Sequence, residues 1–492
     1  MMSRKKYAIT LLLLLMGLVA MAQDTIRMRS CRMGKVPEHV LLRRSLRATG
    51  NPYVGDRRQL VVLAAFADQQ FKASNPLLLW HKIFNQERFD EAPFHGSVHD
   101  YFYDQSGGKF RLTFDLHYVC LADNRSKYRS TEQDDENSKY LVNDLLDSLV
   151  NRGGIDWEPY DWDGDGYIDQ LLIVFAGRGM NAGGGTNSVW PHQWWLSAHW
   201  DSEARTVSSA GKDYTIDAYC CVQELYLQDT YGSFGTICHE YSHCMGLPDF
   251  YYGSRVVVGG WDIMDSGDKN GAGFCPAGYS SHERMLMGWM DIPEITSPTT
   301  ITGMMALGEE PQSYMLRNDA YSNEYYILEN RQKTGWDEKL PGSGLIIFHI
   351  DYDPKVWRGA RSNLTPNTSQ KQCYTLFHAN NKNNTYYEAG WAYPYLSNDS
   401  LTNTSSPVAV LAHPNTDGTT LMSKPITNIS VTNGLISFDV MGGDAQTDIA
   451  SPSPDASLPV TIYAPDGTPR SQLSHGVNIV KQGGKVSKIY QK

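Results

Sequence analysis

The residues with the clearest potential for chemistry form the run His239-Glu240-Tyr241-Ser242-His243. Two histidines four positions apart lie on the same face of a helix, so both imidazoles can reach one metal ion. A glutamate beside the first histidine can take a proton from a water at the metal without binding the metal itself. The pattern therefore predicts His239 and His243 as metal ligands and Glu240 as the general base of a hydrolytic site.

A third ligand is expected from the segment that follows these histidines. A catalytic Zn²⁺ takes three protein ligands and keeps one position open for water. Gly246 can adopt a positive φ without steric cost, which lets the chain leave the helix abruptly. Asp249 can then turn back to the metal as the third ligand. An acid in this position can instead cap a turn or bind calcium, and this alternative stays open.

A second acidic pattern predicts a calcium loop. The run from Asp161 to Asp169 places carboxylates at positions 1, 3, 5 and 9 of an EF-hand-like loop, with Gly166 at position 6 for the turn. The expected oxygen ligands are the carboxylates of Asp161, Asp163, Asp165 and Asp169 and the backbone carbonyl of Tyr167. The usual acid at position 12 is replaced by Leu172, and a solvated acidic turn is the alternative. Because an apolar run follows the loop, we expect the ion to stabilise the fold.

Local patterns predict the elements that carry these residues. The ligand helix is expected over 234–245, with Gly232-Ser233 as its N-cap. Short apolar runs predict buried strands at 59–67 and 171–175, and alternation predicts a strand at 110–114. Helical spacing is found at 99–105 and 140–150. From about residue 296 the sequence changes to short strands and turns, which is typical of an all-β region.

Composition and the amino terminus limit the class of protein. A formal net charge of −11 over 492 residues argues against a nucleic-acid scaffold. A basic stretch, a short apolar run and Ala20-Met21-Ala22 predict a cleaved secretory signal at residues 1–22. A basic leader follows, in which Cys31 could block the metal and the arginines at 43–58 could be cut during maturation. The eight cysteines show no spacing that assigns disulfide pairs.

The chain divides into six predicted segments by composition and pattern. They are a signal peptide at 1–22, a basic leader or propeptide at 23–58, a zinc metallopeptidase domain at 59–295, an all-β accessory domain at 296–442, a linker at 443–457 and a C-terminal β segment at 458–492.

Three separated segments resemble one known family. HEYSHCMGLPD (239–249), WDIMDSG (261–267) and YYILENRQKTGWDEKLPGSGLIIFHIDYD (325–353) are similar to secreted bacterial metallopeptidases of the immune inhibitor A-like, metzincin-type group. The resemblance covers approximately residues 58–442. It implies zinc bound by His239, His243 and Asp249, Glu240 as the base, and Met264 in a turn beneath the metal. Metzincins commonly carry a third histidine where this sequence has Asp249.

The resemblance also implies an α+β fold in which a metzincin-like peptidase domain precedes an all-β, sandwich-like domain and the small C-terminal β segment. That last segment looks like a shortened sorting domain for outer-membrane secretion machinery, with a small β appendage as the alternative. Tyr279 is a candidate for stabilising the transition state, while His282 is expected to be a surface or core histidine.

The sequence therefore predicts a secreted or cell-surface zinc endopeptidase, made as a zymogen, with protein or peptide substrates and no nucleic-acid partner. Two alternatives stay open. One is a zinc hydrolase of non-peptide amides, and the other is a calcium-stabilised binding or adhesion protein with a vestigial zinc site. Retention of Glu240 favours an active enzyme, because a retired site has no reason to keep its base.

Overall fold

The computed structural model describes residues 51–131, 135–357, 365–382, 385–444, 460–482 and 485–491. The predicted signal peptide, most of the basic leader and Cys31 lie outside these residues. Residues through Gly442 form one compact unit, and Gly443–Lys492 form a second. Among the described residues, no helix is both long and apolar enough to cross a membrane.

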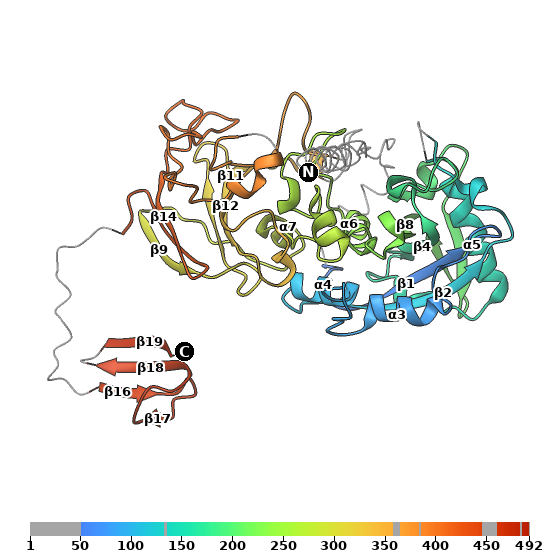
Figure 1. The fold of residues 1–492 in the computed structure, drawn as a ribbon, viewed down its shortest axis with the longest axis horizontal. Coiled ribbons are helices and arrows are strands. Elements are labelled where there is room, and N and C mark those ends of the chain that lie inside the picture. Colours follow the sequence, from blue (N-terminus) through green and yellow to red (C-terminus); the bar gives the residue numbers. More distant parts are fainter. Residues whose placement is uncertain are drawn as a thin grey trace, which may run out of the picture. The chain divides into compact units, whose positions relative to one another are not determined.

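A five-stranded sheet forms the centre of the amino-terminal half (Figure 1). Four of its strands are parallel, and the strand at one edge runs antiparallel to its neighbour. In spatial order the strands are β2 (Phe110–Cys120), β1 (Gly55–Ala65), β4 (Leu171–Arg178), β8 (Ala218–Leu225) and the antiparallel β5 (His192–Trp195). Parallel strands need crossover connections. The connections from β1 to β2 and from β2 to β4 supply helices, and a further helix follows β8.

Helices cover both faces of this sheet. The helices α3 (Pro76–Asn85), α4 (Val98–Gln105) and α6 (Phe234–Cys244) contribute to one apolar cluster, and α5 (Ser138–Arg152) contributes to a cluster on the opposite face. Successive strand residues point to opposite faces, and β1 accordingly sends Val61 and Leu63 to the first cluster and Leu60 and Val62 to the second. This explains why the strand is a continuous apolar run.

Strand β1 begins earlier than the sequence pattern indicates. The basic leader was expected to extend to Arg58, but residues from Gly55 onward pair with β2 in parallel register. Charged side chains are accommodated here because they form ion pairs with residues on β2: Arg58 pairs with Asp115 at 2.7 Å, and Asp56 pairs with Arg111 at 2.6 Å. The apolar run marks only the buried part of the strand.

Two antiparallel sheets form the region after residue 296. One contains β10 (Ser313–Arg317), β11 (Glu324–Arg331), β12 (Gly344–Asp351) and β13 (Tyr374–Leu376) in that order. The other has the order β14 (Ile426–Thr432), β15 (Leu435–Val440) and β9 (Thr299–Met304). Both sheets contribute to a third apolar cluster, through residues such as Leu328 on β11 and Phe438 on β15. This arrangement agrees with a sandwich-like packing of two sheets.

The first of these sheets also packs against the amino-terminal half. On β11, Tyr326 and Leu328 belong to the cluster between the two sheets, whereas Tyr325 and Ile327 belong to the same cluster as helix α6. The two faces of one sheet therefore serve two cores. The fold is a mixed α/β half followed by a β region, and both lie within one compact unit.

The carboxy-terminal unit is a small antiparallel sheet of four strands, with the order β17 (Pro469–Arg470), β16 (Val460–Tyr463), β18 (Gly476–Gln482) and β19 (Lys485–Gln491). A turn with Gly467 at a φ of 86° joins the first two strands in sequence. The predicted strand–turn–strand pattern of this segment is confirmed.

Candidate metal centre

Helix α6 carries both predicted histidine ligands and ends in a turn that brings the third ligand back. The Gly246 N–H donates to His243 O at 2.8 Å, and the Leu247 N–H donates to Ser242 O at 3.2 Å. This pair of bonds is a Schellman motif, which requires a left-handed residue after the helix. Gly246 has a φ of 100°, as the sequence predicted. Asp249 follows three residues later and lies back over the helix.

The start of helix α6 differs from the expected capping. Ser233 is the N-cap residue, but its side chain makes no capping bond to the helix. Its hydroxyl instead donates to Glu224 O at 2.8 Å, on strand β8. The serine therefore attaches the start of the ligand helix to the central sheet, and packing rather than a local cap fixes where the helix begins.

The three predicted ligands converge on one point. The Nε2 atoms of His239 and His243 each lie 3.2 Å from Asp249 Oδ1. All three ligand atoms lie within 4.8 Å of one another. The residues are only 5, 8 and 4 % exposed, in the order His239, His243 and Asp249. Two nitrogens and one carboxylate oxygen at such separations form the donor set that a catalytic Zn²⁺ takes from a protein.

The other nitrogen of each imidazole is fixed by a backbone carbonyl. His239 Nδ1 lies 2.7 Å from Ile263 O, and His243 Nδ1 lies 2.8 Å from Leu247 O. A carbonyl only accepts, so each Nδ1 carries the proton and donates. Each Nε2 is then left with its lone pair toward Asp249. This is the tautomer and ring orientation that a metal-binding histidine needs.

The electrostatics of the ligand set favour a cation. Burial by itself lowers the pKa of His239, but the Asp249 carboxylate outweighs it and raises that pKa to about 10. Burial raises the pKa of Asp249, and the two histidines more than reverse this, so its pKa is well below the usual range. A ligand set that attracts a proton this strongly also attracts a divalent ion.

Glu240 lies beside these ligands with an oxygen that lacks a partner. It is 6 % exposed, and within the described part of the chain its Oε2 is buried with no hydrogen-bond donor, as is Asp249 Oδ1. Buried oxygens of this kind are costly unless something satisfies them. Burial raises the pKa of Glu240, against the lowering effect of His239 and His243. The donor set therefore fits a Zn²⁺ ion with a water beside it.

The turn predicted to lie beneath the metal contacts both ligand-bearing segments. Met264 is fully buried, and its carbonyl accepts from the N–H of Phe250, the residue after Asp249. Ile263 supplies the carbonyl bonded to His239. The segment Trp261–Asp265 thus supports both the helix and the loop.

Two further residues considered from the sequence lie in the core. Tyr279 is fully buried, and its hydroxyl forms a hydrogen bond with Ser242 Oγ, so the structure does not support it as a transition-state stabiliser. His282 is also fully buried and packs against the ring of Trp357. Conversely, the sequence did not single out Asn367 and Tyr374, which contact the segments around the ligands. No local pattern marks them, since both act across more than 90 residues.

The acidic loop brings together three of its four predicted carboxylates. Oxygens of Asp161, Asp163 and Asp169 lie within 4.8 Å of one another. Asp161 Oδ1 is buried without a hydrogen-bond partner among the described residues, and burial raises the pKa of this acid. Asp165 lies outside this group, and its Oδ1 accepts from the Tyr167 N–H at 2.9 Å. Three clustered carboxylates with an unsatisfied oxygen suit a calcium ion.

The loop also connects two sheets. Tyr167 begins β3 (Tyr167–Ile168), which pairs with β7 (Lys212–Ile216) of a small sheet that includes β6 (Arg205–Ser209). Three residues later the chain enters β4 of the central sheet. An ion in the loop would therefore fix the connection between these sheets.

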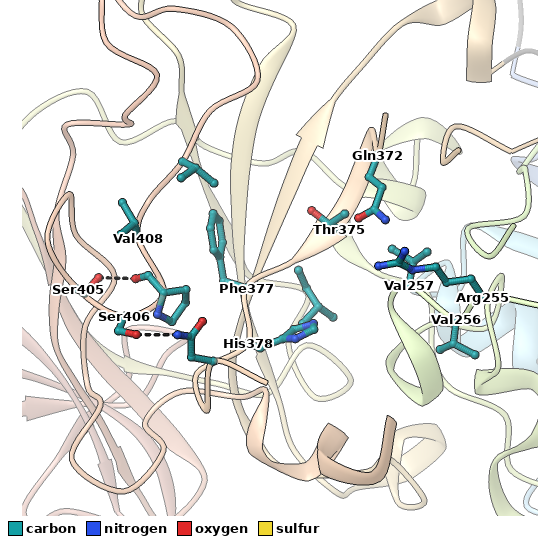
Figure 2. Close-up of a pocket in the computed structure, with 14 residues that line it drawn as sticks. Arg255, Val256, Val257, Gln372, Thr375, Phe377, His378, Ser405, Ser406 and Val408 are labelled. Atoms are coloured by element: carbon teal, nitrogen blue, oxygen red, sulfur yellow. Dashed lines mark hydrogen bonds between the residues drawn. The ribbon is translucent and has the colours of Figure 1, made fainter. Parts of the chain in front are cut away.

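A cavity of about 490 Å³ lies where the loop after Asp249 meets the β region (Figure 2). Figure 2 shows Arg255 and Val257 on one side, Phe377 and His378 in the middle, and Ser405 on the other side. None of the three metal ligands lines this cavity. The cavity lies between residues 255–257, which follow the ligand loop, and the residues around β13.

Two histidines of one helix, an aspartate from the turn that follows and a buried glutamate beside them are the components of a metal-dependent hydrolase. Comparison with known proteins narrows this class. Residues 58–287 match the family described as "Immune inhibitor A peptidase M6, catalytic domain". Over these residues the chain is therefore similar to the catalytic domain of metallopeptidases of the immune inhibitor A family.

Curated relatives agree with this assignment. Over 305 residues the chain is 28 % identical to immune inhibitor A of Bacillus thuringiensis subsp. alesti. This alignment covers 49 % of this chain and 42 % of that protein. Over 217 residues it is 27 % identical to the pre-pro-metalloprotease PrtV of Vibrio cholerae serotype O1, covering 39 % of this chain and 23 % of the relative. The matches thus span less than half the length of these relatives.

Proposed function

We propose that this chain is a secreted, zinc-dependent endopeptidase with Glu240 as its general base. The observation that carries the proposal is the convergence of His239, His243 and Asp249 with an unsatisfied oxygen of Glu240 beside them. The match to a peptidase family over residues 58–287 supports peptide bonds as the substrate class. The relatives are named as an immune inhibitor and a metalloprotease, which agrees with this class.

Each site residue has a specific task in this proposal. When bound, zinc would polarise the scissile carbonyl and lower the pKa of water at the site. His239 and His243 present Nε2 because their Nδ1 protons are held by backbone carbonyls. Glu240 accepts the proton of the attacking water and returns it to the leaving amine. Its raised pKa, caused first by burial, makes it a better base than an exposed carboxylate.

The remaining predictions from the sequence belong to the same proposal. A calcium ion held by Asp161, Asp163 and Asp169 would stabilise the peptidase fold. The predicted signal peptide and basic leader indicate export and a latent form, and the Vibrio relative is named as a pre-pro-metalloprotease. The C-terminal unit is proposed to engage secretion machinery in the outer membrane.

The test pairs metal content with proteolysis. Zinc would be measured by plasma emission spectrometry and casein cleavage by release of soluble peptides, on the wild-type chain with residues 23–50 trimmed and on Glu240→Gln. We expect about one zinc per chain in both proteins and a loss of kcat of about 10²- to 10⁴-fold in the variant. The exposed Glu338→Gln serves as a control and should cleave like the wild type.

The outcomes separate the proposal from its alternatives. Stoichiometric zinc without cleavage of casein or of a peptide library, in the trimmed wild type, would favour a binding protein or a hydrolase of non-peptide amides. Absence of zinc would overturn the ligand assignment. Undiminished cleavage by Glu240→Gln would overturn the role of Glu240 and leave zinc binding intact.

A further inference from the structure

Two buried residues of the β region contact the segments that position the metal ligands. Asn367 and Tyr374 are both fully buried. They follow the matched peptidase segment, which ends at residue 287, by 80 and 87 positions. Tyr374 contacts Asp262, which belongs to the turn beneath the site. Asn367 contacts Phe250, which belongs to the loop that carries Asp249.

Tyr374 is connected to His239 through the turn. Its hydroxyl lies 2.8 Å from Asp262 Oδ2, and the other oxygen of Asp262 accepts the Met264 N–H at 2.8 Å. The Asp262 carboxylate thereby holds the peptide unit between Ile263 and Met264, and the Ile263 carbonyl of that same unit lies 2.7 Å from His239 Nδ1. The phenol of Tyr374, on strand β13, thus contacts the carboxylate that holds the peptide unit beside His239.

Asn367 is connected to Asp249 through the next residue. Its Nδ2 donates to Phe250 O at 2.7 Å and to Tyr374 O at 2.8 Å. Its Oδ1 accepts the N–H groups of Cys373 and Tyr374 at 2.8 and 2.9 Å. The ring of Phe250 stacks on that of Tyr374, with centroids 3.7 Å apart. The amide therefore joins the ligand loop directly to the strand that carries Tyr374.

We propose that Tyr374 and Asn367 are positioning residues of the metal centre, Tyr374 for His239 and Asn367 for Asp249. The inference rests on the proposed zinc function and assigns a role in it to the β region. Partners of metal ligands change metal affinity about 10- to 100-fold when they are lost. The same effect is expected here, through the Asp262 carboxylate and the Ile263–Met264 peptide unit for His239 and through Phe250 for Asp249.

The chain offers a matched control for each residue. Tyr393 is also fully buried, but its hydroxyl has no hydrogen-bond partner within the described residues. Asn415 is 6 % exposed, and its Nδ2 likewise donates to two backbone carbonyls, those of Leu421 and Met422, both outside the metal site. The test pairs are Tyr374→Phe with Tyr393→Phe and Asn367→Asp with Asn415→Asp, each made in the full chain.

The primary readout is the zinc dissociation constant, measured by competition with a chromogenic chelator. The visible spectrum of the Co²⁺-substituted protein reports ligand geometry, and the Tm of the metal-free protein reports the fold. We expect Tyr374→Phe and Asn367→Asp to weaken zinc binding at least about tenfold and to alter the Co²⁺ spectrum. The control variants should stay within about twofold of the wild type in zinc affinity.

A purely structural role predicts a different result. It would lower the Tm of the metal-free protein while the folded fraction keeps wild-type zinc affinity and Co²⁺ spectrum, and this outcome would overturn the inference. If one test variant does not fold, the other pair decides. A wild-type chain that binds no zinc would overturn the proposed function itself, and this inference with it.

Discussion

His239 and His282 are both buried, yet their surroundings give them opposite proton affinities. Burial lowers the pKa of both, but the Asp249 carboxylate raises that of His239 to about 10. His282 lies among the aromatic rings of Tyr325 and Trp357, and burial alone lowers its pKa to about 3. The neighbouring carboxylate, rather than burial, therefore distinguishes the histidine that suits a cation.

His282 predicts a pH dependence of stability. Its folded pKa of about 3 is below the ordinary value of 6.5, so its contribution is complete above pH 6.5 and is lost as pH falls toward 3. Replacement by Phe keeps an apolar ring and removes the titration. Between pH 7 and 4.5, the free energy of unfolding of the wild type should fall by about 2 to 3 kcal/mol more than that of His282→Phe.

This difference is measured by urea unfolding of both proteins at the two pH values in the presence of a chelator, so that release of metal does not contribute. His81→Phe, at an exposed histidine, is the control and should follow the wild type. Equal losses in His282→Phe and the wild type would mean that His282 takes up a proton as readily in the folded state as in the unfolded chain.

At the scale of elements, the turn after helix α6 predicts a specific cost for one methyl group. A Cβ on Gly246 would meet no atom within 4 Å, so only its φ of 100° opposes an alanine there. Left-handed backbone costs a non-glycine residue about 1 to 2 kcal/mol. Gly246→Ala should lower the free energy of unfolding by about that amount and weaken zinc binding, because the turn carries both Leu247 O and Asp249.

The comparison is Gly308→Ala, where a Cβ also meets open space and φ has an ordinary value. Urea unfolding and chelator competition should show no change for this control. Unchanged zinc affinity in Gly246→Ala would show that the ligand loop keeps its position without the Schellman turn.

The acidic loop predicts stabilisation by calcium. The carboxylates of Asp161, Asp163 and Asp169 repel one another, and Asp161 Oδ1 has no hydrogen-bond partner among the described residues; a divalent cation relieves both effects. Calcium at 100 times its dissociation constant should stabilise the fold by about 2.7 kcal/mol, which calorimetry would record as a higher Tm. Asp161→Asn should lose this rise, and the exposed Asp90→Asn should keep it. A rise that survives in Asp161→Asn would place calcium elsewhere.

Elements with a strong local pattern were predictable, and their ends were less so. The buried strands, helix α5 and the ligand helix follow apolar runs and helical spacing, and the positive φ of Gly246 follows from residue type. The start of β1 was missed because its cross-strand ion pairs depend on residues about 55 positions away. The bond from Ser233 to strand β8 was missed for the same reason: it depends on tertiary contacts.

At the scale of the whole molecule, the β region is part of the structure that holds the metal site. Buried Arg331 on β11 donates to Trp261 O at 3.2 Å, and its charge is balanced by Glu329 and Asp337. Glu388 accepts the Gly260 N–H at 2.9 Å. The sequence indicated a separate accessory domain, because the change to short strands and turns near residue 296 shows where strands begin. It does not show which residues the faces of those strands contact.

This arrangement predicts opposite results for two truncations. A chain that ends at Ile295 lacks the strands β10–β13, whose residues form part of the core around helix α6, including Ile327, Phe348 and Tyr374. Its exposed apolar surface should cause aggregation, and it should not retain zinc. A chain that ends at Gly442 keeps the whole compact unit, and it should match the full chain in Tm, zinc content and cleavage of casein. Size-exclusion chromatography, calorimetry and metal analysis of both truncated chains would show which of them fold and bind zinc.

Two outcomes would contradict the prediction. A folded, zinc-loaded 51–295 fragment would show that the peptidase half is self-sufficient. A chain ending at Gly442 that fails to fold would show that the terminal β unit supports the rest.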